Sequence, residues 1–263
     1  MTSISTPGSE KASPDAAKGG TRERGTRRSA LPKRFYKDVA IKDADQGGAS
    51  LLLDGEPVRT PGKAPLILPN LALAEAIAEE WRGQGERIDP ETMPLTRFAN
   101  SVIDGVKGRE DAVIDDILGY AGSDLVCYRA EGPEPLVALQ AKHWEPVVAW
   151  AESDLGAPMR FAAGVMHIEQ PEASLHEIKQ RFEGFDAWSL GALHVMTGLA
   201  GSALLALAVA LQRLSPGEAW GAAHVDEDWQ ISQWGADEEA RIRRANRWRD
   251  FAAATRLLKL LQG

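Results

Sequence analysis

The residues that could perform catalysis or bind a metal are few and widely separated in this sequence. The single cysteine, Cys127, has no activating partner nearby, and Pro61-Gly62-Lys63 lacks both the upstream glycine and the following Ser or Thr of a phosphate-binding loop. The five histidines show no metal-ligand spacing, and each is typical of a surface or core position: His143, His167, His176, His194 and His224. The sequence therefore predicts no catalytic site, no metal and no cofactor.

The densest group of reactive side chains is acidic and aromatic. Asp226, Glu227 and Asp228 are consecutive and precede Trp229. On a helix, three consecutive residues fan out over roughly 200°, so at least one carboxylate must face solvent. The cluster fits either a solvated helix face anchored by one tryptophan or a recognition patch. The second reading rests on tryptophan being a favoured binding anchor and on carboxylates complementing a basic surface.

Charge is distributed unevenly along the 263 residues, whose formal net charge is −8. Residues 1–34 hold eight Lys or Arg and three Asp or Glu, a net charge of +5, which leaves −13 for the remainder. An acidic remainder argues against nucleic acid as the main partner. The single cysteine fits a reducing compartment, which would be the cytoplasm in a bacterium or the mitochondrial matrix in a eukaryote.

The first 33 residues are rich in Ser, Gly, Pro, Thr and charge, a composition that predicts a disordered tail. They contain no apolar segment of the kind that a secretory signal needs. A start rich in Arg and Ser is also typical of mitochondrial transit peptides, but the acidic residues favour a plain solvated tail.

Residues 34–69 predict a small antiparallel β unit. A strand is expected over 35–41, and Ser50–Leu53, Asp54-Gly55 and Val58–Thr60 predict a hairpin, because Asp-Gly supplies the positive φ angles of a tight turn. Residues 66–68 can add another strand. Such a unit is too small to bury both of its faces, so it should pack against the helices that follow.

Residues 70–263 predict a larger, mainly α-helical domain. Asn70 is a suitable N-cap for its first helix, and acidic residues open the final one, expected over 237–261. Pro146 should break or restart the helix that begins near Pro135, because proline lacks the N–H of an interior position. The other expected helices cover 92–106, 110–118, 172–182 and 218–234.

The run from Ala187 to Gln212 contains no charged residue and predicts one long central helix, about 40 Å in length. A helix that is apolar all round is either the buried centre of a helical domain or a membrane span. Three glycines, His194 and the absence of a second hydrophobic run favour the buried helix. The expected fold is therefore α+β, with a small N-terminal antiparallel β unit packed on a larger helical domain that has a long central apolar helix.

Short motifs follow one another across residues 34–261: Arg34-Phe35-Tyr36-Lys37, Leu53-Asp54-Gly55, Thr60-Pro61, Leu68-Pro69, Ala78-Glu79-Glu80-Trp81, Met93-Pro94-Leu95-Thr96-Arg97, Trp144-Glu145-Pro146 with Trp150, Gln230-Ile231 and Trp234-Gly235. Each is weak alone, but in this order and spacing they resemble the Atp-twelve family, whose members are assembly chaperones of the F-type ATP synthase. At Glu145 the family often has Asp, a mild departure.

The resemblance implies a non-enzymatic chaperone that holds the free alpha subunit of the catalytic head until the beta subunit takes its place. It also implies that Trp81, in the Glu-Glu-Trp motif, is sensitive to substitution, although a tryptophan on an amphipathic helix is most often a core residue. Finally, it implies that an acidic residue of the C-terminal segment is needed for function. Glu227 is our choice, with Glu238 and Glu239 as alternatives.

The expected partner-binding residues are Asp226, Glu227, Asp228, Trp229, Trp234, Glu238 and Glu239. The protein is expected to act as a monomer, without nucleic acid and without membrane insertion. The residues alone leave two other classes open. One is an enzyme with an acidic and aromatic pocket around Asp226–Trp234, and the other is a peripheral or single-span membrane protein that uses residues 187–212.

Overall fold

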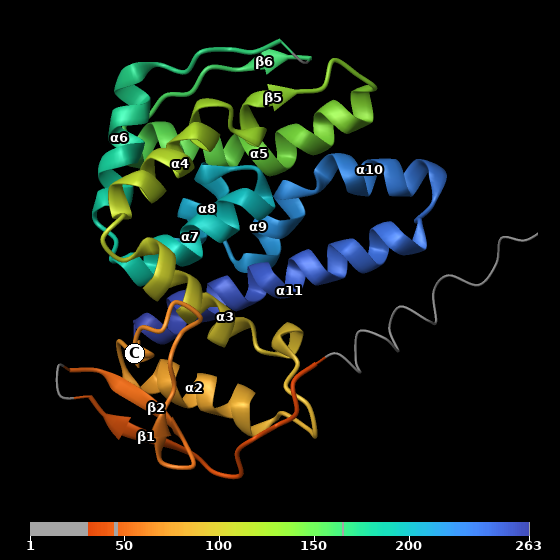
Figure 1. The fold of residues 1–263 in the computed structure, drawn as a ribbon. Coiled ribbons are helices and arrows are strands. Elements are labelled where there is room, and N and C mark those ends of the chain that lie inside the picture. The colour runs from red at the N-terminus through yellow and green to blue at the C-terminus, as the bar shows by residue number, and fades with distance from the viewer. Residues whose placement is uncertain (1–30, 45–46, 165, 263) are drawn as a thin grey trace, which may run out of the picture.

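The structure is a computed structural model that describes residues 31–44, 47–164 and 166–262 (Figure 1). The predicted tail, residues 1–33, lies outside the described residues except for its last three. A small antiparallel sheet near the N-terminus packs beside a larger helical part, which confirms the predicted α+β fold. The division between domains at residues 69 and 70 remains a prediction.

The N-terminal sheet is built around its second strand. Its strands are β1 (Val39–Asp43), β2 (Ala49–Leu53), β3 (Glu56–Pro57) and β4 (Ile67–Leu68). β1 pairs antiparallel with one edge of β2, while β3 and β4 pair with the other. Asp54 and Gly55 make the predicted hairpin turn with φ angles of 51° and 88°. The first strand begins at Val39 and not at Phe35.

Helix α2 (Leu71–Arg82) covers the sheet. Asn70 caps it as predicted, because its side-chain oxygen accepts a hydrogen bond from the backbone N–H of Leu73 at 2.8 Å. The helix buries Leu73 and Ile77 completely, and Leu51 of β2 is equally buried. The sheet and α2 thus close one small core, as expected for a unit too small to bury both faces alone.

The helical part follows in chain order. It comprises a 3₁₀ turn (Pro90–Thr92), α3 (Pro94–Ser101), a π-helical turn (Val102–Val106), α4 (Glu110–Gly122), a 3₁₀ turn (Leu125–Cys127), β5 (Tyr128–Arg129), α5 (Glu134–Leu155), β6 (Ala162–Ala163), α6 (Glu172–Glu183), α7 (Ala187–Ala200), α8 (Ala203–Ala210), α9 (Pro216–Ala223), α10 (Val225–Trp234) and α11 (Glu238–Leu261). The two short strands β5 and β6 form a separate parallel pair.

The central apolar run is two helices, so the prediction of one long helix was wrong. Gly201 ends α7 in the left-handed conformation (φ 67°), and the Ser202 side chain caps α8 by accepting from the N–H of Leu205 at 3.0 Å. Buried Asp124 supports the break, since it accepts from the N–H of Leu204 at 3.1 Å. All residues of α8 are buried. In the part of the chain that the structure describes, no helix could span a membrane.

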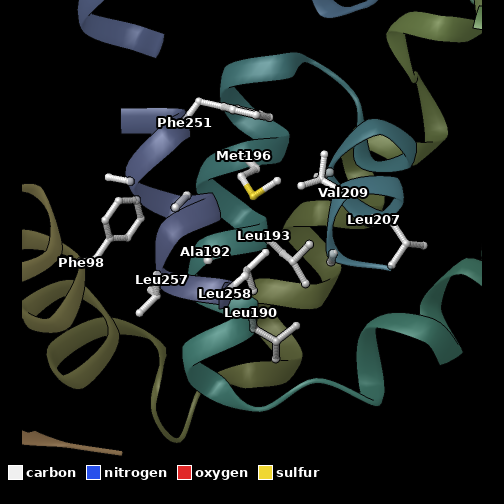
Figure 2. Close-up of a cluster of buried hydrophobic side chains, with 14 of the residues drawn as sticks. Phe98, Leu190, Ala192, Leu193, Met196, Leu207, Val209, Phe251, Leu257 and Leu258 are labelled. Atoms are coloured by element: carbon white, nitrogen blue, oxygen red, sulfur yellow. The ribbon is translucent and has the colours of Figure 1, made fainter. Parts of the chain in front are cut away.

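The main core lies where α7 and α11 pack together (Figure 2). Leu193 and Met196 of α7 are completely buried there, beside Phe251 and Leu257 of α11. Phe98 of α3 reaches the same cluster from the other side of α11. The C-terminal half of α11 is therefore shared between the central helices and α3, and it joins the two parts of the molecule.

Two further predictions of helix boundaries were wrong. Pro146 does not interrupt α5. Pro146 and Lys142, the residue whose carbonyl loses its helical donor, are both exposed, so the missing hydrogen bond lies on the solvent side of the helix. The helix expected over 218–234 is divided at His224, whose backbone leaves the helical region (φ −122°). His224 is buried, with its ring centroid 3.9 Å from that of Trp220.

Candidate functional site

The acidic and aromatic cluster lies on a helical hairpin that we call the arm, made of α10 and residues 238–247 of α11. Figure 1 shows its two helices running antiparallel at the edge of the molecule. From Ser232 to Arg243 every residue except Ala240 is exposed. Gly235 ends α10 with a φ of 86°, and Asp237 caps α11 by accepting from the N–H of Ala240 at 3.0 Å. The arm is thus an ordered helical pair with little of its surface buried.

Two of the three consecutive acidic residues are engaged in holding the arm in place. Asp226 accepts a hydrogen bond of 2.7 Å from the side chain of Gln140 in α5, a residue that is 2% exposed. Gln140 also accepts from the N–H of Ala130 at 2.8 Å, so it links the chain after β5 to α10. Asp228 accepts two hydrogen bonds from Arg244 and ties α10 to α11. If either carboxylate bound a partner in place of these contacts, the arm would be held less firmly.

Glu227 is different from its two neighbours. It is half-buried, and within the described ranges it has no hydrogen bond or ion pair of its own. Its charge acts at longer range on His224 and Arg244. Burial nevertheless lowers the pKa of His224, which keeps that ring neutral at pH 7. Glu227 therefore keeps its full capacity to accept hydrogen bonds from a partner, since nothing in the arm uses it.

Trp234 is an exposed apolar residue on the face of α10 that carries Glu227. It is 79% exposed, and it lies seven residues after Glu227, which places the two on one face of α10. Half-buried Ile231 lies between them on that face. Trp229 is half-buried as well. The face thus carries a free carboxylate at one end and an exposed indole at the other.

The other acidic candidates lie in the first turn of α11 and are fully exposed. Glu238 accepts from Arg241 at 2.8 and 2.7 Å, and this pair lowers the pKa of Glu238. Glu239 pairs with Arg243 at 3.5 Å. Exposed pairs of this kind hold their partners weakly, so both carboxylates remain accessible. Ile242, which no sequence pattern singled out, is 40% exposed and lies off the buried stripe of α11.

Trp81 lies on α2, and its contacts are with the N-terminal unit. Its ring meets Tyr36 edge-on at 5.5 Å, and its carbonyl accepts from the Tyr36 hydroxyl at 2.7 Å. The two glutamates before it make further links. Glu80 accepts from the N–H of Leu95 at the start of α3, and Glu79 lies 3.7 Å from Arg256 of α11. The Glu-Glu-Trp motif therefore joins α2 to its neighbours, which is a structural role.

Metal ligands and nucleophiles are sparse among the described residues. Among the described residues, no group of three or more His, Cys, Asp or Glu could hold a metal ion. Burial, together with the charge of Asp124, raises the pKa of Cys127 to about 12, so the thiol is not a nucleophile at neutral pH. The side chains of the acidic cluster also diverge: Asp226 points to α5, Asp228 to α11 and Trp234 to solvent.

Comparison with known proteins gives consistent matches. The family model of the ATP12 chaperone protein matches residues 33–152. A solved structure of a candidate chaperone from Agrobacterium tumefaciens is 48% identical, with a TM-score of 0.85, and the match covers 88% of this chain and 87% of that one. The crystal structure of Atp12 from Paracoccus denitrificans is 42% identical, with a TM-score of 0.82 and coverage of 88% and 98%.

Proposed function

Because this chain belongs to the ATP12 chaperone family, we propose that it holds the free alpha subunit of the F-type ATP synthase head, through its arm, until the beta subunit takes its place. The family supports a chaperone that serves ATP synthase assembly. The alpha subunit as client and the arm as contact site are our proposal. We also propose that the protein is a monomer, is not an enzyme, and acts in the bacterial cytoplasm or the mitochondrial matrix.

A free alpha subunit would need a partner that covers its exposed surface. A free alpha subunit exposes surface that is buried against the beta subunit in the assembled head, and exposed apolar surface drives aggregation. A partner of modest affinity can cover that surface and still be displaced. Binding and release of this kind need no covalent chemistry, no metal and no cofactor.

The observation that carries the choice of the arm is the free carboxylate of Glu227 on the same face as exposed Trp234. Tryptophan is enriched among residues that dominate binding energy, and a charged group beside it selects the partner's orientation. Asp226 and Asp228 fix the helix that presents this face, through Gln140 and Arg244. The face is therefore held in place before a partner arrives, which lowers the entropic cost of binding.

Glu227→Lys tests this assignment. If the carboxylate pairs with a cation of the client in a desolvated contact, reversing its charge should cost about 2 kcal/mol or more, roughly a 30-fold loss of affinity. The stability of the protein should fall by no more than about 1 kcal/mol, because the charge of Glu227 acts on the start of α10 and on Arg244 only at longer range, without a hydrogen bond. The readouts are suppression of aggregation of purified alpha subunit, and the melting temperature.

Glu177→Lys is the matched control. Glu177 is half-buried in the middle of α6, distant from the arm in sequence, and it undergoes the same change of charge. It should bind the alpha subunit as the wild type does. Full retention of binding by Glu227→Lys would refute the assignment and move the test to Glu238 and Glu239. Loss of binding by the control would mean that overall charge, and not this face, governs the contact.

A further inference from the structure

A groove of about 340 Å³ opens at the base of the arm, where α3, the π-helical turn, α7 and α11 meet. Its lining is mainly apolar: Phe98, Val102, Val106, Gly191, Val195 and Leu199. The volume lies at the lower end of the range found for ligand pockets in proteins. The groove is therefore large enough to receive apolar side chains of a partner.

One wall of the groove is a π-helical turn that the rest of the structure holds in shape. The i to i+5 hydrogen bond from the N–H of Lys107 to the carbonyl of Val102 measures 2.9 Å. Asp104, inside the turn, accepts from the Thr60 hydroxyl at 2.6 Å and from the N–H of Gly62 at 2.8 Å. Such turns are rare and occur often at functional sites.

Gly191 lets α7 approach this wall closely. A Cβ atom at that position would lie 2.6 Å from a methyl carbon of Val102, so any other residue would force the Val102 side chain to move. The close contact and the hydrogen bonds of Asp104 come from separate parts of the chain. Together they make the groove a formed feature and not a gap between mobile side chains.

Arg247, the last residue of the arm, contacts a residue that lines the groove. Arg247 donates to the carbonyl of Leu199, a groove residue, at 2.6 Å. Within the ranges that the structure describes it has no carboxylate partner, whereas Arg97 on the other rim is paired with Asp250 at 2.5 Å. The guanidinium has further N–H groups to donate. α11 holds seven Arg or Lys and three Asp or Glu, so the helix that carries Arg247 is basic within a protein of net charge −8.

We propose that the groove seats the apolar side chains of an acidic, amphipathic segment of the client, with a client carboxylate on Arg247. The proposal rests on the proposed function and adds a second contact, continuous with the arm. The occupant follows from charge complementarity: an apolar groove edged by an unpaired guanidinium favours a segment that carries carboxylates beside its apolar residues. A basic segment would be repelled at the same edge.

The test uses the full chain and overlapping synthetic peptides that span the alpha and beta subunits. Ser101 is exposed and lines the groove, so Ser101→Trp fills it, and Arg247→Glu reverses its edge. The wild type should bind peptides that are both acidic and apolar, and each variant should weaken this binding by about tenfold or more. Ser153→Trp, at an exposed position of α5, and Arg249→Glu are matched controls that should bind as the wild type does.

The outcomes separate this proposal from the proposed function. Binding of acidic amphipathic peptides by a wild type that fails to protect the alpha subunit would leave the groove assigned and refute the alpha-subunit role. Protection of the alpha subunit that Ser101→Trp and Arg247→Glu leave unchanged would overturn the groove alone. The groove proposal would also be overturned if the wild type bound no acidic peptide. A wild-type dimer that Ser101→Trp dissociates would overturn it too, because a second copy of the chain would then occupy the groove.

Discussion

The two halves of α11 lie in opposite environments although they belong to one continuous helix. From Phe251 onward the helix packs against α7, α3 and α2, and Phe251, Ala254 and Leu257 are at most 1% exposed. Before Arg247 seven of the nine residues of the helix are exposed, and three of the nine are arginines. The 24 residues span about 36 Å, of which the core uses a little less than half. Packing in the core explains the burial of the second half, whereas the exposure of the first half is explained by our proposal that it binds a partner.

The largest effect is expected from Phe251→Ala, which breaks the buried half. Removing a fully buried phenylalanine from the contact with α7 should cost about 3–5 kcal/mol, because a cavity replaces the ring. In a chain of this size the melting temperature should fall by roughly 10 °C. Thermal unfolding followed by circular dichroism measures it. A loss below about 1 kcal/mol would show that the core tolerates the cavity and that the two halves differ less than the burial indicates.

An intermediate and pH-dependent effect is expected at Asp124, the buried carboxyl that accepts from the N–H of Leu204 at the start of α8. Burial raises the pKa of Asp124 to about 6, although the hydrogen bonds that the carboxylate accepts lower it. A carboxyl whose pKa is raised on folding favours the folded state at low pH, and this contribution is lost as the pH rises from about 4 to about 6. Over that window the wild type should lose up to about 3 kcal/mol relative to Asp124→Asn, which cannot ionise.

The measurement is the free energy of unfolding by urea at several pH values, as the difference between wild type and Asp124→Asn. Taking the difference removes the opposite contribution of His224, whose pKa burial lowers and whose protonation therefore destabilises the fold as the pH falls. A difference that does not vary between pH 4 and pH 6 would contradict the raised pKa. Such a result would mean that the hydrogen bonds from Leu204 and Val126 outweigh the burial of the carboxylate.

The smallest effect on stability, but a large one on binding, is expected from Trp234→Ser in the arm. An indole that is 79% exposed contributes little to folding, so the free energy of unfolding should change by no more than about 0.5 kcal/mol. Binding of the alpha subunit should weaken by about 2 kcal/mol if the indole is an anchor. Phe35→Ser is the control, an aromatic residue 73% exposed in the N-terminal unit, and it should not affect binding. Equal binding by both variants would remove the distinction between the arm and the rest of the surface.

Features that depend on neighbouring residues could be predicted from the sequence. The Asp54-Gly55 turn, the Asn70 cap and the start of α11 each need only a few adjacent residues, and all three were confirmed. The break between α7 and α8 was missed although Gly201-Ser202 is a suitable stop and start. Its third support, Asp124, is 80 residues away from Leu204 in the sequence, and no local pattern reveals it.

The site shows the same limit. The sequence located the acidic and aromatic cluster, but it could not show which carboxylate is free. That distinction depends on Gln140, which lies 86 residues from Asp226, and on Arg244, which lies 16 residues from Asp228. The groove was not predicted at all, because its walls come from helices that are adjacent only in the folded molecule. The role of each expected site residue in binding stays a prediction until the variants are tested.

The cap of α2 has a consequence for how the protein is made. Besides accepting from Leu73, Asn70 donates to the carbonyl of Leu260 in α11 at 2.7 Å, across 190 residues of sequence. α11 also packs against α2, α3 and α7. A nascent chain leaving the ribosome therefore has no partner for these surfaces until α11 has been synthesised. Until then the apolar surfaces that α11 covers on α2, α3 and α7 stay exposed, so the chaperone itself passes through a stage in which it is prone to aggregation.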